Sequence, residues 1–253
     1  MKKKLVLSLA LTLTVMGSAA FASPPDDDAE ACWQKGVQAA SLSKDYVPGR
    51  FYMKFEQLDG DGKTKDQKET WMKLLPGDKE TQVVKVLQNG KDITRETLEA
   101  EKERKREEAK KKDGGRSITL SNEEIVPLLS NSNKPVVHNY IGREKINGAD
   151  CLVFEFRKEH IRKKGTANET VIHQGKLWLD AASGIPVKTS FSPTPLPSMV
   201  KQMDMDAAFV PDGDTFFLKD YKMVVKAGIL FLAKRFRISF VLGAYRKAEK
   251  ENQ

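Results

Sequence analysis

The sequence predicts a mainly β protein in which one curved antiparallel sheet forms an incomplete β-barrel, with a few helices packed on or in it. Three observations support this fold class. Segments such as 51–56 and 151–157 alternate apolar and polar residues, which is the period of a half-buried strand. Tight-turn pairs such as Asn89-Gly90 and Asn147-Gly148 follow strand-like segments. About ten strands are expected, and no long helices alternate with them, which favours an antiparallel sheet.

The first 22 residues have the pattern of a secretory signal peptide. Lys2, Lys3 and Lys4 precede the apolar run from Leu5 to Val15, and small residues surround a cleavage site after Ala22. We therefore expect export across the inner membrane and a mature periplasmic protein that begins at Ser23. An uncleaved anchor is the alternative reading of the same segment.

The mature chain of 231 residues is long enough for a single β domain spanning residues 23–253. Removal of the three signal lysines from the 43 basic residues leaves 40, against 35 acidic residues, for a net charge of +5. This excess is small and spread along the chain, so we expect no nucleic-acid partner. No second stretch of about 20 apolar residues is present to span a bilayer.

The mature chain is expected to begin with a helix that docks on the sheet. Asp28 can cap a helix starting near Ala29. Trp33, Val37 and Ala40 then recur at helical spacing, which gives the helix one apolar face. We interpret this face as ordinary packing rather than as a binding site.

The next strands are predicted at 51–56, 69–75 and 81–87. Residues 95–113 then form a charged insert, which contains eight basic and six acidic residues between Arg95 and Lys112. The Glu/Lys pairs at i,i+4 spacing favour a solvated helix, with a mobile loop or a partner-docking arm as alternatives. A short helix is expected at 122–129, over the sheet or its opening, because Ser121 and Glu124 have capping-box spacing.

The centre of the chain predicts two hairpins, and the end predicts a further run of strands. The first hairpin joins 136–146 to 151–157, and the second joins 176–180 to 185–191. A polar connection is expected between them. The later strands are expected at 199–209, 215–226, 229–233 and 235–242.

The two central hairpins carry a family resemblance. The segments IGREKINGADCLVFEF and GKLWLDAASGIPVKTSF resemble the periplasmic outer-membrane lipoprotein-sorting proteins and their lipoprotein-carrier relatives. The resemblance is strongest between Val136 and Pro193 and does not extend to the charged insert. It implies an incomplete barrel around an apolar cavity, a lipid, acyl chain or lipoprotein as the ligand, and no catalytic centre.

Two cysteines in an exported chain suggest a disulfide between Cys32 and Cys151, with two independent buried thiols as the alternative. Such a bridge would close a long loop, which the chain-entropy estimate values at roughly 4–5 kcal/mol before strain.

No constellation for catalysis, a cofactor or a metal is evident. Asp59-Gly60-Asp61 begins like a calcium loop, but Thr64 and Thr70 occupy the positions of its glycine and glutamate. The histidines are scattered at His138, His160 and His173, and each is interpreted as a surface or strand residue. We therefore expect a protein that is not an enzyme.

Apolar residues on the curved sheet remain as the candidate site. Methionines supply adaptable walls for a cavity, and the expected lining residues are Trp71, Met72, Trp178, Met203 and Met205, with ordinary core packing as the alternative for each. The preferred function is a periplasmic lipid or lipoprotein carrier. The alternative is an interaction or envelope-stress signalling module that grips an envelope protein with the same fold, and a hydrolase is a more distant third.

Overall fold

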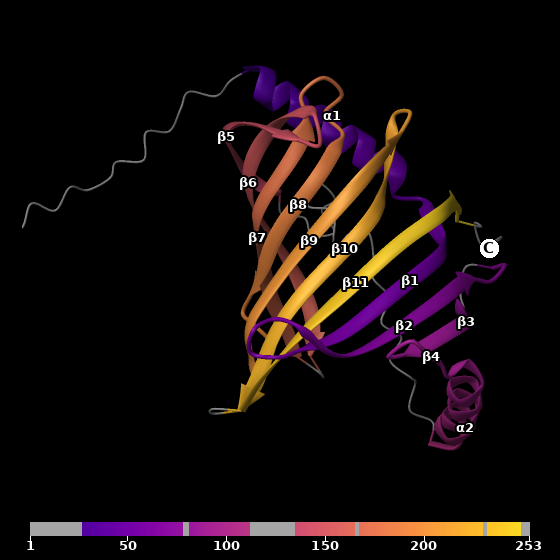
Figure 1. Ribbon diagram of the computed structural model, residues 1–253. Helices are drawn as coiled ribbons and strands as arrows, with labels where there is room; N and C mark the ends of the chain where they lie inside the picture. The colour runs from indigo at the N-terminus through magenta and orange to yellow at the C-terminus, as the bar shows by residue number, and fades with distance from the viewer. Residues whose placement is uncertain (1–26, 78–80, 112–134, 165–166, 230–231, 249–253) are drawn as a thin grey trace, which may run out of the picture.

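The structure is a computed structural model that describes residues 27–77, 81–111, 135–164, 167–229 and 232–248. These residues form one 11-stranded antiparallel sheet and two helices (Figure 1). The sheet is strongly curved and does not close, so the predicted incomplete barrel is confirmed. The elements in chain order are α1 (Asp27–Ser43), β1 (Tyr46–Leu58), β2 (Thr64–Leu74), β3 (Thr81–Gln88), β4 (Lys91–Asp92), α2 (Thr94–Lys111), β5 (Val137–Ile146), β6 (Ala149–Lys164), β7 (Ala167–Asp180), β8 (Pro186–Thr194), β9 (Val200–Asp212), β10 (Thr215–Ile229) and β11 (Leu232–Lys247).

The first and last strands are hydrogen-bonded neighbours. β1 pairs with β11 from Tyr46 opposite Lys247 to Leu58 opposite Arg235. From this seam, β2, β3 and β4 follow toward one edge of the sheet, and β10 to β5 follow in reverse chain order toward the other. The edge strands β4 and β5 are not paired with each other in the described part of the chain, which leaves the barrel open.

Helix α1 packs across one end of the sheet, on the face that we call the inner face (Figure 1). The Trp33 side chain is only 3% exposed, and its ring stacks on His138 of β5 with a centroid separation of 3.9 Å. At the other end of the helix, Ser43 Oγ accepts a hydrogen bond from the backbone N–H of Phe216 on β10 (2.9 Å). The predicted docking helix is therefore confirmed, and it is attached at both of its ends.

A second, smaller apolar cluster lies on the opposite, outer face of β6 and β7. Cys151, Val153 and Trp178 form its buried centre. Cys32 belongs instead to the main core beneath α1. Because side chains alternate between the faces of a strand, Cys151 points away from the core that holds Cys32. Both cysteines are free buried thiols in the structure, so the predicted bridge is not formed.

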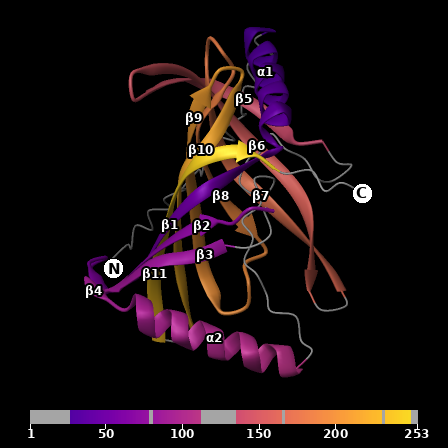
Figure 2. The same ribbon diagram turned by 90° about the vertical axis from the view of Figure 1, so that its right-hand side faces the viewer.

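Helix α2 contains most of the charged insert and lies at the opposite end of the molecule from α1 (Figure 1, Figure 2). Asp92 Oδ1 accepts hydrogen bonds from the backbone N–H (2.9 Å) and hydroxyl (2.6 Å) of Thr94 at the start of the helix. Thr94 Oγ1 in turn accepts a hydrogen bond from the backbone N–H of Val86 on β3 (2.9 Å). Farther along, the Arg95–Glu99 ion pair is exposed to solvent. The described part of the insert is thus a helix tied to the sheet at its N-terminus.

The two Asn-Gly hairpin turns are confirmed. Asn89 and Asn147 have φ angles of 51°, and the following Gly90 and Gly148 have φ angles of 82° and 89°. Two positive φ values in succession are the requirement of a type I′ hairpin turn.

Two strand boundaries were predicted wrongly. The polar connection expected after Arg157 is a long hairpin, because β6 continues to Lys164 and β7 already begins at Ala167. Polar side chains do not end a strand whose backbone is paired along its length. The three strands expected from 215 to 242 are two, β10 and β11. The predicted signal peptide and the predicted helix at 122–129 lie outside the described residues.

Candidate ligand-binding surface

Apolar side chains from five strands meet on the inner face. The strand register aligns them in rows, so that Met205 of β9 lies opposite Met223 of β10, and Met223 lies opposite Ile238 of β11. Ile238 in turn lies opposite Phe55 of β1. We call the part of this surface that is not fully buried the inner stripe, and its residues are Phe51, Met53, Phe55, Met72, Met203, Met223, Val225, Phe236, Ile238, Phe240 and Leu242.

Burial differs between the two parts of the inner face. In the core that includes α1, Phe154, Leu177 and Phe216 are at most 3% exposed. The residues of the inner stripe are only half-buried, and Phe55 remains 36% exposed. Contiguous apolar surface left in contact with water forgoes about 25 cal/mol per Å² and commonly marks a ligand or partner site. The inner stripe is therefore the candidate ligand-binding surface.

Three of the five predicted lining residues lie on the inner face. Met72 and Met203 belong to the inner stripe. Met205 is 7% exposed and is part of the main core, so the packing alternative holds for this residue.

The two predicted tryptophans lie on the outer face and do not line the inner stripe. Trp71 directly precedes Met72 on β2, and adjacent strand residues point to opposite faces. Trp178 packs beside Val153, and its indole Nε1–H donates a hydrogen bond to Glu144 Oε2 (2.8 Å). The period of two along a strand already implied that Trp71 and Met72 cannot share a face.

A polar cluster on the inner face was missed by the sequence analysis. Lys158 and His173 are paired across β6 and β7, and they are only 3% and 8% exposed. The His173 ring lies 4.5 Å from the ring of His160 and 5.1 Å from that of Phe191. The sequence of β6 could have revealed this cluster, because Leu152, Phe154, Phe156, Lys158 and His160 are every second residue of the strand and therefore point to the same face.

The third histidine helps to hold α1 against the sheet. His138 Nε2 lies 3.0 Å from Glu30 Oε2 of α1, while its ring stacks on Trp33. The hydrogen bond from Gln34, together with the contact with His138, lowers the pKa of Glu30 below its ordinary value. This group links the edge strand β5 to the helix rather than forming a ligand site of its own.

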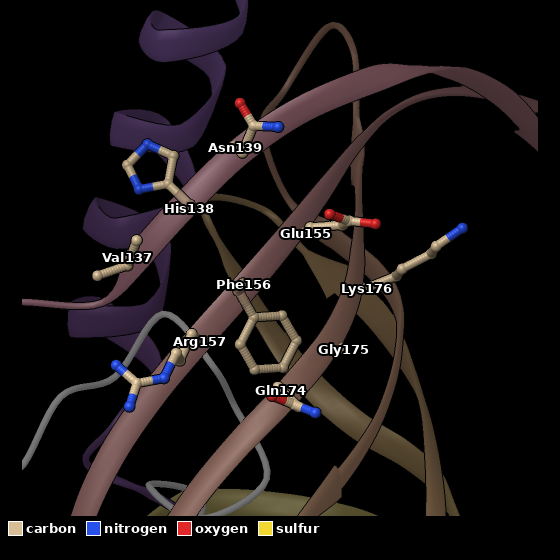
Figure 3. Close-up of a pocket in the computed structure, with 9 residues that line it drawn as sticks. All are labelled: Val137, His138, Asn139, Glu155, Phe156, Arg157, Gln174, Gly175 and Lys176. Atoms are coloured by element: carbon tan, nitrogen blue, oxygen red, sulfur yellow. The ribbon is translucent and has the colours of Figure 1, made fainter. Parts of the chain in front are cut away.

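A hollow of about 500 Å³ lies where β5 begins to pair with β6 (Figure 3). Phe156 and Gly175 line its middle, and the charged side chains of Glu155, Arg157 and Lys176 surround them (Figure 3). Because these charged residues carry both signs, and Arg157 is already ion-paired with Glu159 (2.8 Å), the hollow favours no particular ligand charge. The complete lining is Val137, His138, Asn139, Glu155, Phe156, Arg157, Gln174, Gly175 and Lys176.

Among the described residues, no three His, Cys, Asp or Glu side chains gather in a way that could hold a metal ion. Within the same part of the chain, no helix is both long and apolar enough to cross a membrane.

Comparison with known proteins yields only distant structural similarity. No family model and no curated protein matches the chain. A DUF1329 family protein from Desulfovibrio piger is 12% identical, covering 87% of this chain and 93% of that protein, with a TM-score of 0.35. LprF from Mycobacterium bovis is 11% identical, with 90% and 99% coverage and a TM-score of 0.28. The Pseudomonas aeruginosa MucA/MucB complex gives 10% identity, 88% and 100% coverage, and a TM-score of 0.22. TM-scores this low do not bear on function.

Proposed function

We propose that this protein binds an acyl chain, as a free lipid or as part of a lipoprotein, along the inner stripe of its open half-barrel. One observation carries the proposal: eleven apolar side chains from five adjacent strands form a continuous surface that is only half-buried. A packed core of this composition would be excluded from water, as the part beneath α1 is.

The chemistry of the inner stripe suits a flexible apolar chain. Met53, Met72, Met203 and Met223 supply unbranched, polarisable side chains that adapt to an irregular guest. Each buried methylene of an acyl chain contributes about 0.8 kcal/mol, so a chain of ordinary length could bind usefully even when it is incompletely covered. The surface needs no catalytic group for this task, and the proposal is of a binding protein rather than an enzyme.

The proposal includes a compartment. We infer periplasmic export from the signal-peptide pattern of residues 1–22, and in that compartment an acyl chain needs protection from water during transfer between membranes. We propose carriage of a lipid or lipoprotein across that space as the role, and the fold and this surface support it.

The first test is direct. Protein purified from the periplasm should carry lipid that organic extraction and mass spectrometry detect, and the delipidated protein should bind a fluorescent fatty acid. A folded protein that carries no lipid and takes up no fatty acid contradicts the proposal.

A pair of variants locates the site. Met223→Lys places an ammonium group in the middle of the inner stripe, where its long side chain can reach water, so folding should survive. Fatty-acid affinity should fall by about tenfold or more, because the acyl chain must then contact or displace a charge. The matched control is Val224→Lys, which places the same charge on the outer face at the next residue of β10, between Asp204 and Arg237.

The two variants give distinct outcomes. If Val224→Lys retains its affinity for the fatty acid and Met223→Lys loses it, the inner stripe is supported as the binding site. Equal fatty-acid affinities in the two variants would contradict that assignment. Met205→Arg is a poor test, because Met205 is in the main core and an unpaired buried charge there should prevent folding.

A further inference from the structure

The outer face of the sheet carries a groove that the proposed function does not use. It has a volume of about 500 Å³, within the roughly 300–1,000 Å³ range of small-molecule sites. It runs across β3, β2, β1 and β11, and we call it the outer groove. Its lining residues are Arg50, Phe51, Tyr52, Trp71, Met72, Lys73, Val84, Val241, Leu242 and Gly243.

The outer groove and the inner stripe lie on opposite faces of the same strands. Tyr52 pairs with Trp71 and with Val241, whereas Phe51 pairs with Met72 in the row that faces inward. Side chains of Tyr52, Trp71 and Val241 therefore form the walls of the outer groove. Phe51, Met72 and Leu242 belong both to the inner stripe and to the lining of the outer groove, so the two sites share strands. The outer groove is distinguished by Tyr52, Trp71 and Val241 on the opposite face, and its assignment does not rest on the acyl-chain proposal.

A glycine that the backbone does not require keeps the outer groove open. Gly243 pairs with Arg50, and a Cβ atom built on Gly243 would meet nothing within 4 Å. Its φ angle is not in the left-handed region, so neither backbone strain nor a close neighbour explains glycine here. Glycine inside a strand costs stability and often marks a place that a ligand approaches closely.

The walls of the outer groove are apolar and accessible to solvent. The Tyr52 and Trp71 rings lie 4.9 Å apart with an interplanar angle of 48°, so they present a broken aromatic surface. Val84 is 55% exposed and Val241 is 43% exposed. This combination suits the hydrocarbon or aromatic body of a ligand.

The charge around the outer groove is cationic. Arg50 and Lys73 are among its lining residues, which include no acidic residue. The Nζ atom of Lys85 lies over the Trp71 ring, 5.5 Å from the ring centroid. Three acids lie near these residues. Glu69 accepts the hydrogen bond of the Tyr52 hydroxyl (2.8 Å), and Glu56 is ion-paired with Lys54 (3.3 Å) and Arg237 (3.3 Å). Asp220 pairs with Val241 across β10 and β11 and is not among the lining residues. A ligand with one anionic group is therefore complementary to Arg50 and Lys73, which form the cationic rim of the outer groove.

We propose that the outer groove binds a small amphiphilic anion, with its apolar body against Trp71 and Val241 and its anionic group on Arg50 and Lys73. A concave site of this size takes a separate ligand molecule, whereas a membrane surface would require protruding apolar side chains.

The three tryptophans of the chain allow the two faces to be tested separately. In protein carrying ¹⁵N-labelled indoles, titration with dodecanoate below its micelle concentration should shift the Trp71 signal in a saturable manner. Trp33 and Trp178 serve as internal references, and Trp71→Phe assigns the signal. Dodecyltrimethylammonium, which has the same chain with the opposite charge, should shift the Trp71 signal only at concentrations at least about tenfold higher.

Variants then assign the parts of the outer groove. Gly243→Leu fills the open space and should abolish the Trp71 shift. Arg50→Gln combined with Lys73→Gln, both on the exposed rim, should weaken dodecanoate binding by about tenfold without a change in folding. Met223→Lys on the inner face should leave the Trp71 titration unchanged.

Several outcomes would overturn the proposal. A Trp71 signal that does not respond to saturating dodecanoate removes the site, and an equal response to the cationic detergent removes its charge selectivity. Loss of the Trp71 response in Met223→Lys would show that the inner stripe, not the outer groove, binds the ligand. A Trp71 response only to vesicles of dioleoylphosphatidylglycerol, and none to free dodecanoate, would reassign the surface to membrane contact.

Discussion

The attachment of α1 to the sheet depends on a glycine in the turn between β7 and β8. Gly184 has a φ angle of +74°, and a Cβ atom at this position would lie 2.6 Å from Lys35 Cβ and 2.7 Å from the backbone oxygen of Cys32. Gly213, in the turn between β9 and β10, has a φ angle of +60° but no atom within 4 Å of a Cβ. The pair Gly184→Ala and Gly213→Ala therefore separates backbone strain from helix contact.

Both variants carry the strain of alanine at a positive φ, about 1–2 kcal/mol. Only Gly184→Ala also drives a methyl group into α1, and overpacking typically costs a further 1–3 kcal/mol or so. The Cys32 oxygen belongs to the helix backbone and cannot rotate away, so the helix or the turn must move. We expect the free energy of unfolding of Gly184→Ala to lie about 1–3 kcal/mol below that of Gly213→Ala.

Urea unfolding followed by circular dichroism gives the two free energies. Hydrogen exchange of the α1 amides should accelerate in Gly184→Ala and remain at the wild-type rate in Gly213→Ala, because only the first variant loosens the helix. Equal stabilities within about 0.5 kcal/mol, or unchanged exchange in α1, would refute the contact between α1 and this turn.

Three further predictions concern the thiols, an acid and the charged helix. Burial raises the pKa of the Cys32 thiol to about 11, so we expect Cys32 and Cys151 to label slowly in the native protein and both to label in non-reducing denaturant; a disulfide would leave neither reactive. The hydrogen bonds of Glu30 in the folded protein lower the pKa of its carboxyl group. The stability that Glu30 contributes is therefore present above its unfolded-state pKa of 4.5, and it is lost as the pH falls below that value. Glu30→Gln should therefore show a smaller loss of melting temperature on acidification than the wild type, and identical profiles would contradict this role. Replacement of residues 99–113 by a Gly/Ser linker should leave the melting temperature nearly unchanged, because the segment is rich in charged residues and almost free of apolar ones; a large drop would show that the segment packs.

Local sequence determined much of the fold. The Asn147-Gly148 pair specifies a hairpin because both residues adopt positive φ at little cost, and the alternation in 151–157 places Leu152 and Phe154 on one face wherever the strand lies. Such features depend only on neighbours along the chain. They were sufficient for the fold class and for the helix that begins near Ala29.

Only the tertiary structure decided which face of each strand is the inner one. Trp71 and Met72 are adjacent and both apolar, so the local sequence does not indicate which of them faces inward. The pairing of β2 with β1 and the position of α1 determine that Met72 is the residue on the inner face. The same holds for Lys158, which is buried and pairs with His173 of β7, and for Gly243, whose open surroundings depend on strands far away in the chain. A period of two fixes which residues lie together but not which side meets the core, because that side is set by contacts between distant segments.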